Sequence, residues 1–206
     1  MGNMLQEKDT KWYGSRYGGF YVVPKLLKNE GRALCVGIGE DISFDIQLIG
    51  LHQFSVVGID PTKKAKDYIQ KIMPNNYKFI EKALVCESYD FNTIKMYENT
   101  NPEWVSESIL TTHSSVGSRH YDAKICKLSN FQKEKFDLIK LDIEGAEYSI
   151  IDEFVDFSCN HLCIEFHHHC TSYTESDTER CIKKLYDKGF TNILTNNYQE
   201  VTFIKN

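Results

Sequence analysis

The sequence lacks any long apolar run. No stretch approaches the ~20 consecutive apolar residues that a membrane-spanning helix needs. The first eleven residues are polar and include Glu7, Lys8, Asp9 and Lys11, so they do not resemble a secretory signal. Gln6 stands where N-myristoylation requires serine or threonine. We therefore expect no membrane span, no myristoyl anchor and a cytoplasmic location.

An excess of basic residues is also lacking. The chain has 24 lysines and arginines against 29 acidic residues, which gives a formal net charge of −5. Nucleic-acid binders usually carry a basic excess or a basic stripe. The densest basic cluster, Lys63, Lys64 and Lys66, is typical of the solvated start of a helix. We therefore expect no nucleic-acid partner.

The cysteines do not form the pattern of a disulfide framework. Their number, seven, is odd, and Cys35 and Cys163 lie inside apolar runs. Buried free thiols in a reducing compartment fit this pattern better than disulfides do. The cysteines therefore add support to the cytoplasmic location.

Short apolar runs and amphipathic segments alternate along the chain. Buried strands are expected at 33–38, 55–59, 77–80, 136–141 and 161–166. Helices are expected at 42–51, 63–73, 148–157 and 178–188. Strands that alternate with helices predict an α/β fold with a parallel sheet. The last segments, 190–194 and 201–204, predict an antiparallel hairpin joined by 195–199.

Two segments stand apart from this alternation. Residues 13–20 place three glycines among aromatic residues ahead of the first strand. Residues 86–118 are polar and irregular, and they are too long for a plain connection. We expect 86–118 to be a functional insertion or a mobile loop.

A glycine turn follows the first strand. Gly37, Ile38 and Gly39 end the apolar run and lead into a helix, but the third glycine of the dinucleotide fingerprint is missing. Glu40 and Asp41 stand where a pyrophosphate would lie, and their negative charge repels phosphate. The turn therefore favours an uncharged nucleoside with a cationic group, although an ordinary strand-to-helix turn has the same pattern.

Two further strand ends are candidates for cofactor contacts. Asp60, followed by Pro61, lies 23 residues after Gly37, the spacing at which an acidic residue typically binds ribose hydroxyls. The alternative is that Asp60 only caps the following helix. Lys82 and Ala83 follow the third strand and would neighbour an adenine, although a plain loop fits them equally well.

A carboxylate cluster ends the fourth strand. Asp142 and Glu144 alternate with Ile143, so both can point to one face at the end where parallel sheets bind ligands. Glu147, by contrast, is expected only to place charge in the first turn of the next helix.

Glu165 and His167 share a face at the end of the fifth strand. Together with Asp142 they can bind a metal, or act as a base and its hydrogen-bond partners. A zinc site built from Cys159, Cys163, Cys170 and a histidine has irregular spacing and is disfavoured. Four other histidines are weaker candidates: His168 and His169 as loop residues, and His113 and His120 as acid or base groups of the insertion.

The run Lys-Leu-Asp-Ile-Glu-Gly-Ala-Glu at 140–147 resembles the signature of the FkbM-type methyltransferases. These are class I enzymes that use S-adenosylmethionine and often O-methylate sugars or natural products. Residues 36–41 and 58–61 are similar to the first cofactor motif and the ribose carboxylate of that class, and 125–128 resemble the strand before the signature. The likeness covers residues 13–166, although Cys-Val-Gly-Ile-Gly replaces the common acidic-Ile-Gly-Ala-Asn of the first motif.

The resemblance implies one domain over 1–206 with a Rossmann-like class I methyltransferase sandwich. Its sheet has seven strands, six of them parallel, and one antiparallel strand is inserted by the terminal hairpin. Residues 14–20 resemble a segment that closes over the cofactor in some relatives, so 1–24 are expected to be lid-like. Residues 86–118 are expected to shape the acceptor pocket.

The resulting prediction is a methyltransferase that uses S-adenosylmethionine to O-methylate a hydroxyl of a small molecule or glycan. The expected cofactor contacts are Gly37, Ile38, Gly39, Asp41, Asp60, Pro61, Lys82, Ala83 and Asp142. The expected catalytic residues are Asp142, Glu144 and His167. A divalent metal on Asp142, Glu165 and His167 is an alternative that we do not predict.

Two rival functions have the same fold. One is a NAD-dependent oxidoreductase, against which the missing third glycine and the acidic pair argue. The other is a non-catalytic nucleotide-binding module, against which the intact carboxylate cluster argues. The sequence carries no signal for an oligomeric state.

Overall fold

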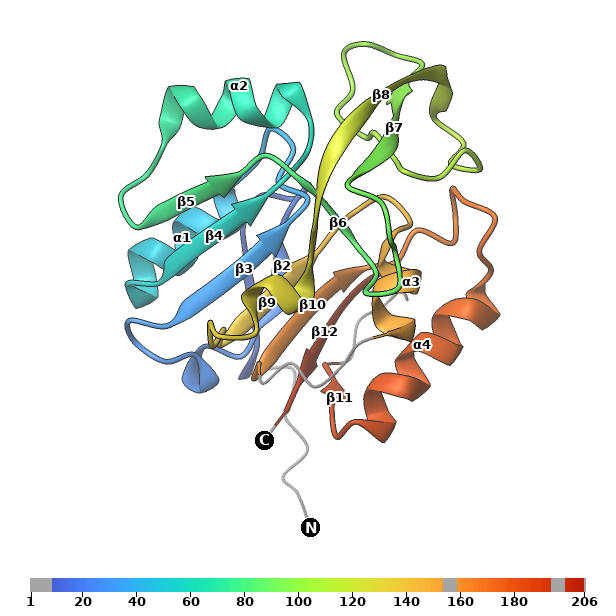
Figure 1. Cartoon of the computed structure of the whole chain (residues 1–206). Coiled ribbons are helices and arrows are strands. Elements are labelled where there is room, and N and C mark those ends of the chain that lie inside the picture. The colour runs from blue at the N-terminus through green and yellow to red at the C-terminus, as the bar shows by residue number, and fades with distance from the viewer. Residues whose placement is uncertain (1–8, 154–158, 194–198, 206) are drawn as a thin grey trace.

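A seven-stranded sheet forms the centre of the computed structural model, which describes residues 9–153, 159–193 and 199–205 (Figure 1). Its strands are β3 (Arg32–Val36), β4 (Ser55–Ile59), β5 (Tyr77–Ile80), β9 (Leu138–Leu141), β10 (His161–Glu165), β11 (Thr191–Asn192) and β12 (Glu200–Ile204). They are ordered β11-β12-β10-β9-β3-β4-β5, and β12 alone runs against its neighbours. The expected mostly parallel sheet with its terminal hairpin is confirmed.

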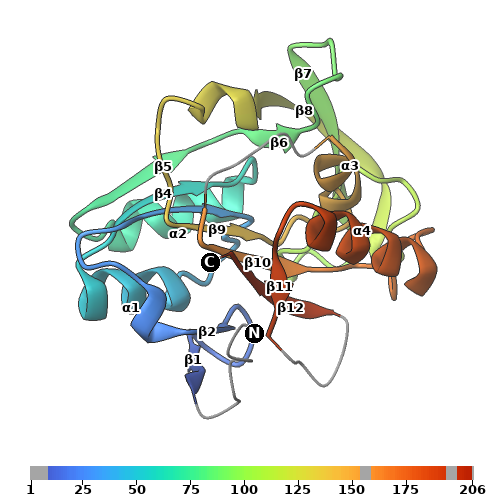
Figure 2. The same cartoon turned by 90° about the horizontal axis from the view of Figure 1, so that it is seen from below.

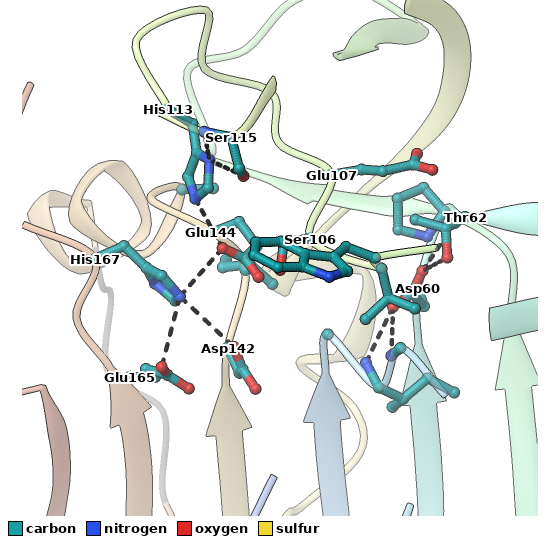
Figure 3. A pocket seen from close by; sticks show the side chains of 18 of the residues that line it. Asp60, Thr62, Ser106, Glu107, His113, Ser115, Asp142, Glu144, Glu165 and His167 are labelled. Atoms are coloured by element: carbon teal, nitrogen blue, oxygen red, sulfur yellow. Dashed lines mark hydrogen bonds and ion pairs between the residues drawn. The ribbon is translucent and has the colours of Figure 1, made fainter. Parts of the chain in front are cut away.

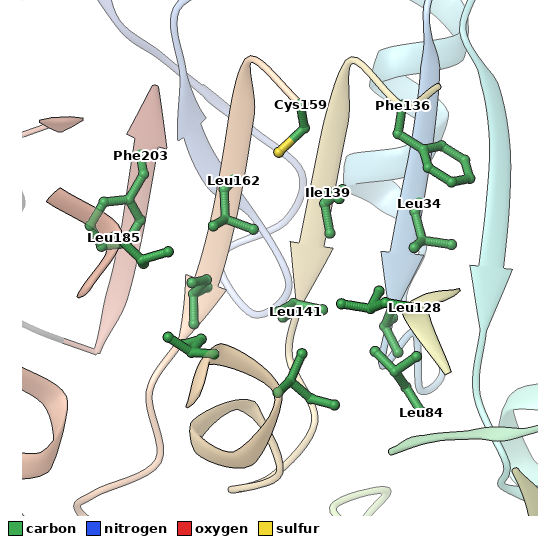
Figure 4. Packing of buried hydrophobic residues seen from close by; sticks show 14 of the residues in the cluster. Leu34, Leu84, Leu128, Phe136, Ile139, Leu141, Cys159, Leu162, Leu185 and Phe203 are labelled. Atoms are coloured by element: carbon green, nitrogen blue, oxygen red, sulfur yellow. The ribbon is translucent and has the colours of Figure 1, made fainter. Parts of the chain in front are cut away.

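Helices and other elements cover both faces of this sheet. The helices are α1 (Ser43–His52), α2 (Lys63–Ile72), α3 (Glu147–Asp152) and α4 (Glu175–Asp187). Successive strand residues point to opposite faces, so Leu34 and Ile139 pack with α3 and α4, whereas Cys35 and Leu138 pack with α1 and α2. Figure 4 shows the first of these two clusters. The sheet is therefore buried on both sides, as near-continuous apolar strands require.

The N-terminal segment is a hairpin of β1 (Lys11–Tyr13) and β2 (Phe20–Val22), followed by the short helix η2 (Pro24–Leu26). Phe20 and Val22 are fully buried, and the Thr202 hydroxyl donates a hydrogen bond to the Tyr21 carbonyl at 2.7 Å. The hairpin lies on the same side of the sheet as α1 (Figure 2). The strands of this expected lid are thus part of the core, and the turn between them is hydrogen-bonded to α1 through the N–H groups of Gly14 and Ser15. That this turn closes over a cofactor stays a prediction.

The insertion is more regular than its sequence indicates. A second sheet, ordered β6-β8-β7, contains β6 (Ala83–Val85), β7 (Thr93–Asn99) and β8 (Val116–Lys127), and the short helix η3 (Leu128–Phe131) follows it. The expectation that 86–118 are irregular was therefore wrong. Most side chains of β7 and β8 are exposed or half-buried, so the strands lack the apolar pattern that marks a buried strand.

The remaining boundaries agree closely with the expected ones. The helix expected at 148–157 begins at Glu147 and is described to Asp152, and 154–158 lie outside the described residues. The loop expected at 195–199 lies outside them too, apart from its last residue.

All seven cysteines are free thiols, and Cys35 and Cys163 are buried as expected.

No helix in the described part of the chain is long and apolar enough to cross a membrane.

Candidate functional site

A pocket of about 420 Å³ opens at the carboxyl ends of β3, β4, β9 and β10 (Figure 3). It brings together nearly all of the site residues that the sequence predicts. These are Gly37, Ile38, Gly39, Asp41, Asp60, Pro61, Ala83, Asp142, Glu144, Glu165 and His167. Lys82 does not line the pocket, although its neighbour Ala83 does. The parallel sheet produces this convergence, because the carboxyl ends of its strands meet at one edge.

The glycine turn lies against the end of β9. Gly37 has a φ of +76°, and a Cβ there would come within 1.5 Å of the Asp142 carbonyl oxygen. Only glycine permits this approach. The buried Lys140 ammonium joins the same two segments, because it donates to the Gly37 carbonyl at 2.9 Å and to Asp142 Oδ2 at 3.1 Å. The glycine turn and the end of β9 are thus held in fixed positions relative to each other.

Both carboxylate oxygens of Asp60 accept hydrogen bonds from the protein itself. Its Oδ2 accepts hydrogen bonds from the N–H groups of Ile38 and Gly39, both at 3.0 Å. Its Oδ1 accepts from the N–H and the hydroxyl of Thr62, at 2.8 and 2.6 Å. These four bonds use the acceptor positions of a carboxylate. Asp60 therefore holds the glycine turn in place, and its contact with ribose stays a prediction.

Asp41 ties the N-terminal hairpin to α1. It accepts hydrogen bonds from the Ser15 hydroxyl and from the Ser43 N–H. Burial acts to raise the pKa of Asp41, but these hydrogen bonds outweigh it and lower the pKa. The exposed Tyr17 and its neighbour Gly18 line the pocket from the same hairpin turn. The hairpin turn therefore lines the pocket together with the glycine turn.

Three carboxylates face one imidazole at the other end of the pocket. His167 Nε2 lies 3.4 Å from Glu144 Oε2, 3.8 Å from Glu165 Oε1 and 3.9 Å from Asp142 Oδ1 (Figure 3). Burial alone would lower the pKa of His167, but Glu147 and these carboxylates raise it to about 10. Burial, followed by Asp142, raises the pKa of Glu165 to about 8. The surrounding carboxylates favour the protonated form of the ring, so His167 is a poorer candidate for a base than its place at a strand end indicates.

Glu147 is a site residue that the sequence analysis missed. Its side chain is fully buried, and its Oε1 accepts hydrogen bonds from the backbone N–H of His167 at 2.9 Å and from His167 Nδ1 at 3.0 Å. Its Oε2 accepts from the Gly145 N–H. Glu147 therefore orients His167, beyond adding charge to the start of α3. An acidic residue in a first helical turn has the same sequence pattern in either role.

Glu144 has a left-handed backbone, with a φ of +53°, which is uncommon for a residue with a side chain. The insertion stabilises this conformation, because the Ser108 hydroxyl donates to the Glu144 carbonyl at 2.6 Å. His113 Nε2 contacts Glu144 Oε2 at 2.9 Å. The Ser115 N–H donates to His113 Nδ1, so the proton of the neutral ring lies on Nε2 and is donated to Glu144.

The electrostatics of Glu144 follow from these contacts. Burial acts to raise its pKa, but the hydrogen bond from His113 and the charge of His167 outweigh burial and lower it. His113 thus joins the site, whereas the exposed His120 on β8 does not line the pocket. No local signal distinguished the two histidines, because the contact joins positions 31 residues apart.

Two other features complete the site. Glu107, which the sequence analysis missed, lines the pocket on the side of Asp60 and accepts a hydrogen bond from the Tyr121 hydroxyl at 2.7 Å. Burial raises the pKa of Glu107.

Within the described residues, two groups of side chains are able to hold a metal ion. One consists of His113, Glu144 and Cys170, and the other of Asp142, Glu165 and His167. The disfavoured cysteine-rich zinc set is not among them.

Comparison with solved structures supports the fold. The fibrillarin pre-rRNA processing protein of Methanococcus jannaschii matches with a TM-score of 0.51 and 11% identity, over 86% of this chain and 66% of that chain. The precorrin-6y C5,15-methyltransferase of Geobacter metallireducens matches with a TM-score of 0.47 and 13% identity, over 87% of this chain and 82% of that chain. At 11% identity the likeness to the fibrillarin protein concerns the fold alone.

A third structure is much longer than this chain. MtNAS, solved with MTA and tNA, matches with a TM-score of 0.45 and 9% identity, over 87% of this chain but 55% of that chain. The chain thus spans about half the length of that protein. A search of curated protein sequences found no match.

Comparison with protein families is decisive. The methyltransferase FkbM domain matches residues 13–191, which is most of the chain and includes the glycine turn and the carboxylate cluster. The resemblance noted in the sequence is therefore confirmed. The protein belongs to the FkbM methyltransferase family.

Proposed function

We propose that this protein transfers the methyl group of S-adenosylmethionine to a hydroxyl oxygen of a small molecule or glycan. Membership of a methyltransferase family supports the reaction class. The observation that carries the proposal is that the glycine turn and the carboxylate cluster open into one pocket. Donor and acceptor can therefore meet in a single cavity, and positioning of this kind is worth ~7–11 kcal/mol of an activation barrier.

The donor side is the half of the pocket lined by the glycine turn, Asp60 and Ala83. The turn has no basic residue, which suits a nucleoside without phosphates, and the negative charges of Asp41 and Asp142 suit a sulfonium. Glu107 offers a further carboxylate for the polar groups of the nucleoside. Its Oε2 is bonded to Tyr121, and no hydrogen bond from a described residue reaches its Oε1.

The acceptor side is polar, which favours a hydroxylated substrate. His113, Glu144, Glu165 and His167 line it, and each can exchange hydrogen bonds with hydroxyl groups. In the transfer step the acceptor oxygen forms a bond to the methyl carbon while the carbon–sulfur bond breaks. The products are the methyl ether and S-adenosylhomocysteine, and the hydroxyl proton goes to Glu144, which His113 supports by its hydrogen bond.

The first test is calorimetric titration of the protein with S-adenosylmethionine, with S-adenosylhomocysteine and with NAD. We expect micromolar binding of the first two and no binding of NAD. Asp60→Ala should weaken the binding at least tenfold, because it releases the glycine turn. The matched control is Asp122→Ala on the exposed face of β8, which should bind as the native protein does.

Hydroxylated acceptors are screened next, and nucleic acids are screened beside them, because their expected exclusion stays a prediction. If folded protein binds neither S-adenosylmethionine nor its product, the proposal is wrong. Binding of NAD would favour the oxidoreductase. Tight binding of S-adenosylmethionine without transfer to any acceptor would favour the binding module.

A further inference from the structure

Asp142, Glu165 and His167 stand at the ends of two adjacent strands, β9 and β10, with their side chains turned toward one point. We propose that these three side chains bind one divalent transition-metal ion, with Mn²⁺ as the probe of this class. Binding itself is independent of the methyl-transfer proposal. The role of the ion, which is to position an acceptor hydroxyl, rests on that proposal.

The distances fit a shared cation better than hydrogen bonds. His167 Nε2 lies 3.8 Å from Glu165 Oε1 and 3.9 Å from Asp142 Oδ1, beyond the usual hydrogen-bond length. Two ligand atoms that bind one ion through bonds of about 2.1 Å are about 3.0 Å apart at a right angle and about 4.2 Å apart in line. The two separations from His167 fall between these limits, and all three ligand atoms lie within 4.8 Å of one another.

The orientation of His167 is an independent indication of a ligand. The ring is 96% buried, and its Nδ1 proton is donated to the fully buried carboxylate of Glu147 at 3.0 Å. A metal ion that displaces the second ring proton would therefore meet the lone pair on Nε2, whose nearest carboxylate oxygen within the described residues is Glu144 Oε2 at 3.4 Å. A histidine that binds a metal almost always donates its other ring N–H to such a group.

The negative charge of the carboxylates also favours a bound cation. Asp142, Glu144 and Glu165 are about four-fifths buried and surround one point. In the described part of the chain a single ammonium group contacts them, that of Lys140, and it pairs with Asp142 Oδ2. Asp142 Oδ1 thus remains available. Like charges repel strongly in a partly buried site, and a divalent cation that displaces the His167 proton would offset more of this repulsion than the single charge of the ring does.

The neighbouring set of His113, Glu144 and Cys170 is a poorer site. Because Ser115 donates its N–H to His113 Nδ1, the proton of the neutral ring is on Nε2. That atom donates to Glu144 at 2.9 Å and lies 3.2 Å from Cys170 Sγ, so a metal ion there would have to replace an existing hydrogen bond. The two sets therefore differ in their hydrogen bonds, and this difference makes the proposal specific.

Two carboxylates and one imidazole favour a first-row ion. Carboxylates suit Mn²⁺ and Mg²⁺, whereas imidazole suits Zn²⁺ and Fe²⁺, so the mixed set favours the transition metals over Mg²⁺. Three protein ligands leave positions open for water or substrate. An acceptor hydroxyl bound there would lie beside Glu144, the residue that we propose takes its proton.

The test is titration of chelator-treated protein with Mn²⁺. Binding is measured as the loss of the six-line paramagnetic resonance spectrum of the free ion. We expect one ion bound per chain. His167→Gln and Glu165→Gln should abolish the binding, and Glu147→Gln should weaken it about 10–100-fold, because it removes the partner of the ligating histidine. The matched histidine control, His120→Gln on the exposed surface of β8, should bind as the native protein does.

Circular dichroism and thermal melting establish that each variant is folded, and Asp142→Asn replaces any variant that is not. The inference is overturned if folded native protein binds neither Mn²⁺ nor Zn²⁺, or if His113→Gln loses the ion while His167→Gln keeps it. Parallel titration with S-adenosylmethionine separates the two proposals. Cofactor binding without metal binding contradicts this inference alone, and metal binding without cofactor binding contradicts the proposed function alone.

Discussion

The carboxylates of the pocket have two different kinds of task. Asp60 and Glu147 accept hydrogen bonds from backbone N–H groups of other segments, so they fix the glycine turn and His167. Asp142 and Glu165 instead keep an oxygen directed at the cavity. A strand that ends in an acidic residue predicts that a carboxylate is near the site. It does not predict which kind of task the carboxylate has, because the partners come from distant segments.

Glu144→Gln tests the residue that we propose takes the proton. Glutamine keeps the size of the side chain and can still accept the hydrogen bond from His113, but it is not a base. We expect kcat to fall about 10²–10⁴-fold, with the affinity for S-adenosylmethionine nearly unchanged. Glu153→Gln, outside the pocket, is the control. Native turnover in Glu144→Gln would assign the proton to another group.

Gly37→Ala tests the contact between the glycine turn and β9. The new Cβ would meet the Asp142 carbonyl oxygen at 1.5 Å, and φ is +76° there. We expect a loss of at least about 2 kcal/mol in the free energy of unfolding, because the backbone must shift. Gly50→Ala in α1 meets no atom within 4 Å and should gain about 1 kcal/mol. Denaturant titration measures both, and equal stability of the two variants would contradict the geometry.

At the scale of elements, the pocket is lined by the strand ends of the sheet, by the insertion and by the turn of the N-terminal hairpin. The strands of the sheet could be predicted because they are buried on both faces and are therefore continuously apolar. The strands β7 and β8 could not, because neither face of this hairpin is fully covered. The loop between β7 and β8 nevertheless brings Ser108 and His113 to Glu144.

Thr62→Ala tests the link between the start of α2 and the glycine turn. The Thr62 hydroxyl accepts the Ala65 N–H at 3.2 Å as a helix cap, and it donates to Asp60 Oδ1 at 2.6 Å. We expect a loss of about 1–2 kcal/mol in the free energy of unfolding and weaker binding of S-adenosylmethionine. Thr62→Ser keeps the hydroxyl and should restore both quantities. If Thr62→Ala changes stability alone, the link to the turn is not required for binding.

At the scale of the whole molecule, the N-terminal hairpin and the sheet form one core. Tyr13, Phe20 and Val22 pack in the same cluster as Cys35 and Leu138. His161 of β10 is buried at this junction, where its Nε2 accepts the Val23 N–H at 3.4 Å. Its Nδ1 has no partner in the described part of the chain. Protonation of His161 therefore opposes folding of the whole unit.

His161 gives a pH dependence of stability. Burial lowers its native pKa to about 4, whereas the unfolded value is about 6.5. As the pH falls from about 6.5 to about 4, the unfolded chain binds a proton that the native protein does not. The free energy of unfolding therefore decreases over this range, by about 3 kcal/mol for this residue. Above pH 6.5 His161 does not contribute to the pH dependence of the free energy of unfolding.

The measurement is denaturant unfolding at pH 7 and pH 4.5, with His161→Gln as the comparison. Other groups titrate in both the native protein and the variant. The difference between the two proteins in how the free energy of unfolding changes with pH therefore reports on His161. We expect the variant to lose less stability than the native protein on acidification. Equal slopes would show that the native ring is accessible to protons.

The sequence by itself determined the family, the parallel sheet with its terminal hairpin, and the pocket residues at the strand ends. It could do so because apolar strands, the glycine turn and the carboxylate run are each continuous in the chain. The tertiary structure alone decided the partners of Asp60, Glu147 and His113. The reason is physical: the role of a charged side chain depends on which donors surround it, and folding brings those donors from segments far apart in the sequence.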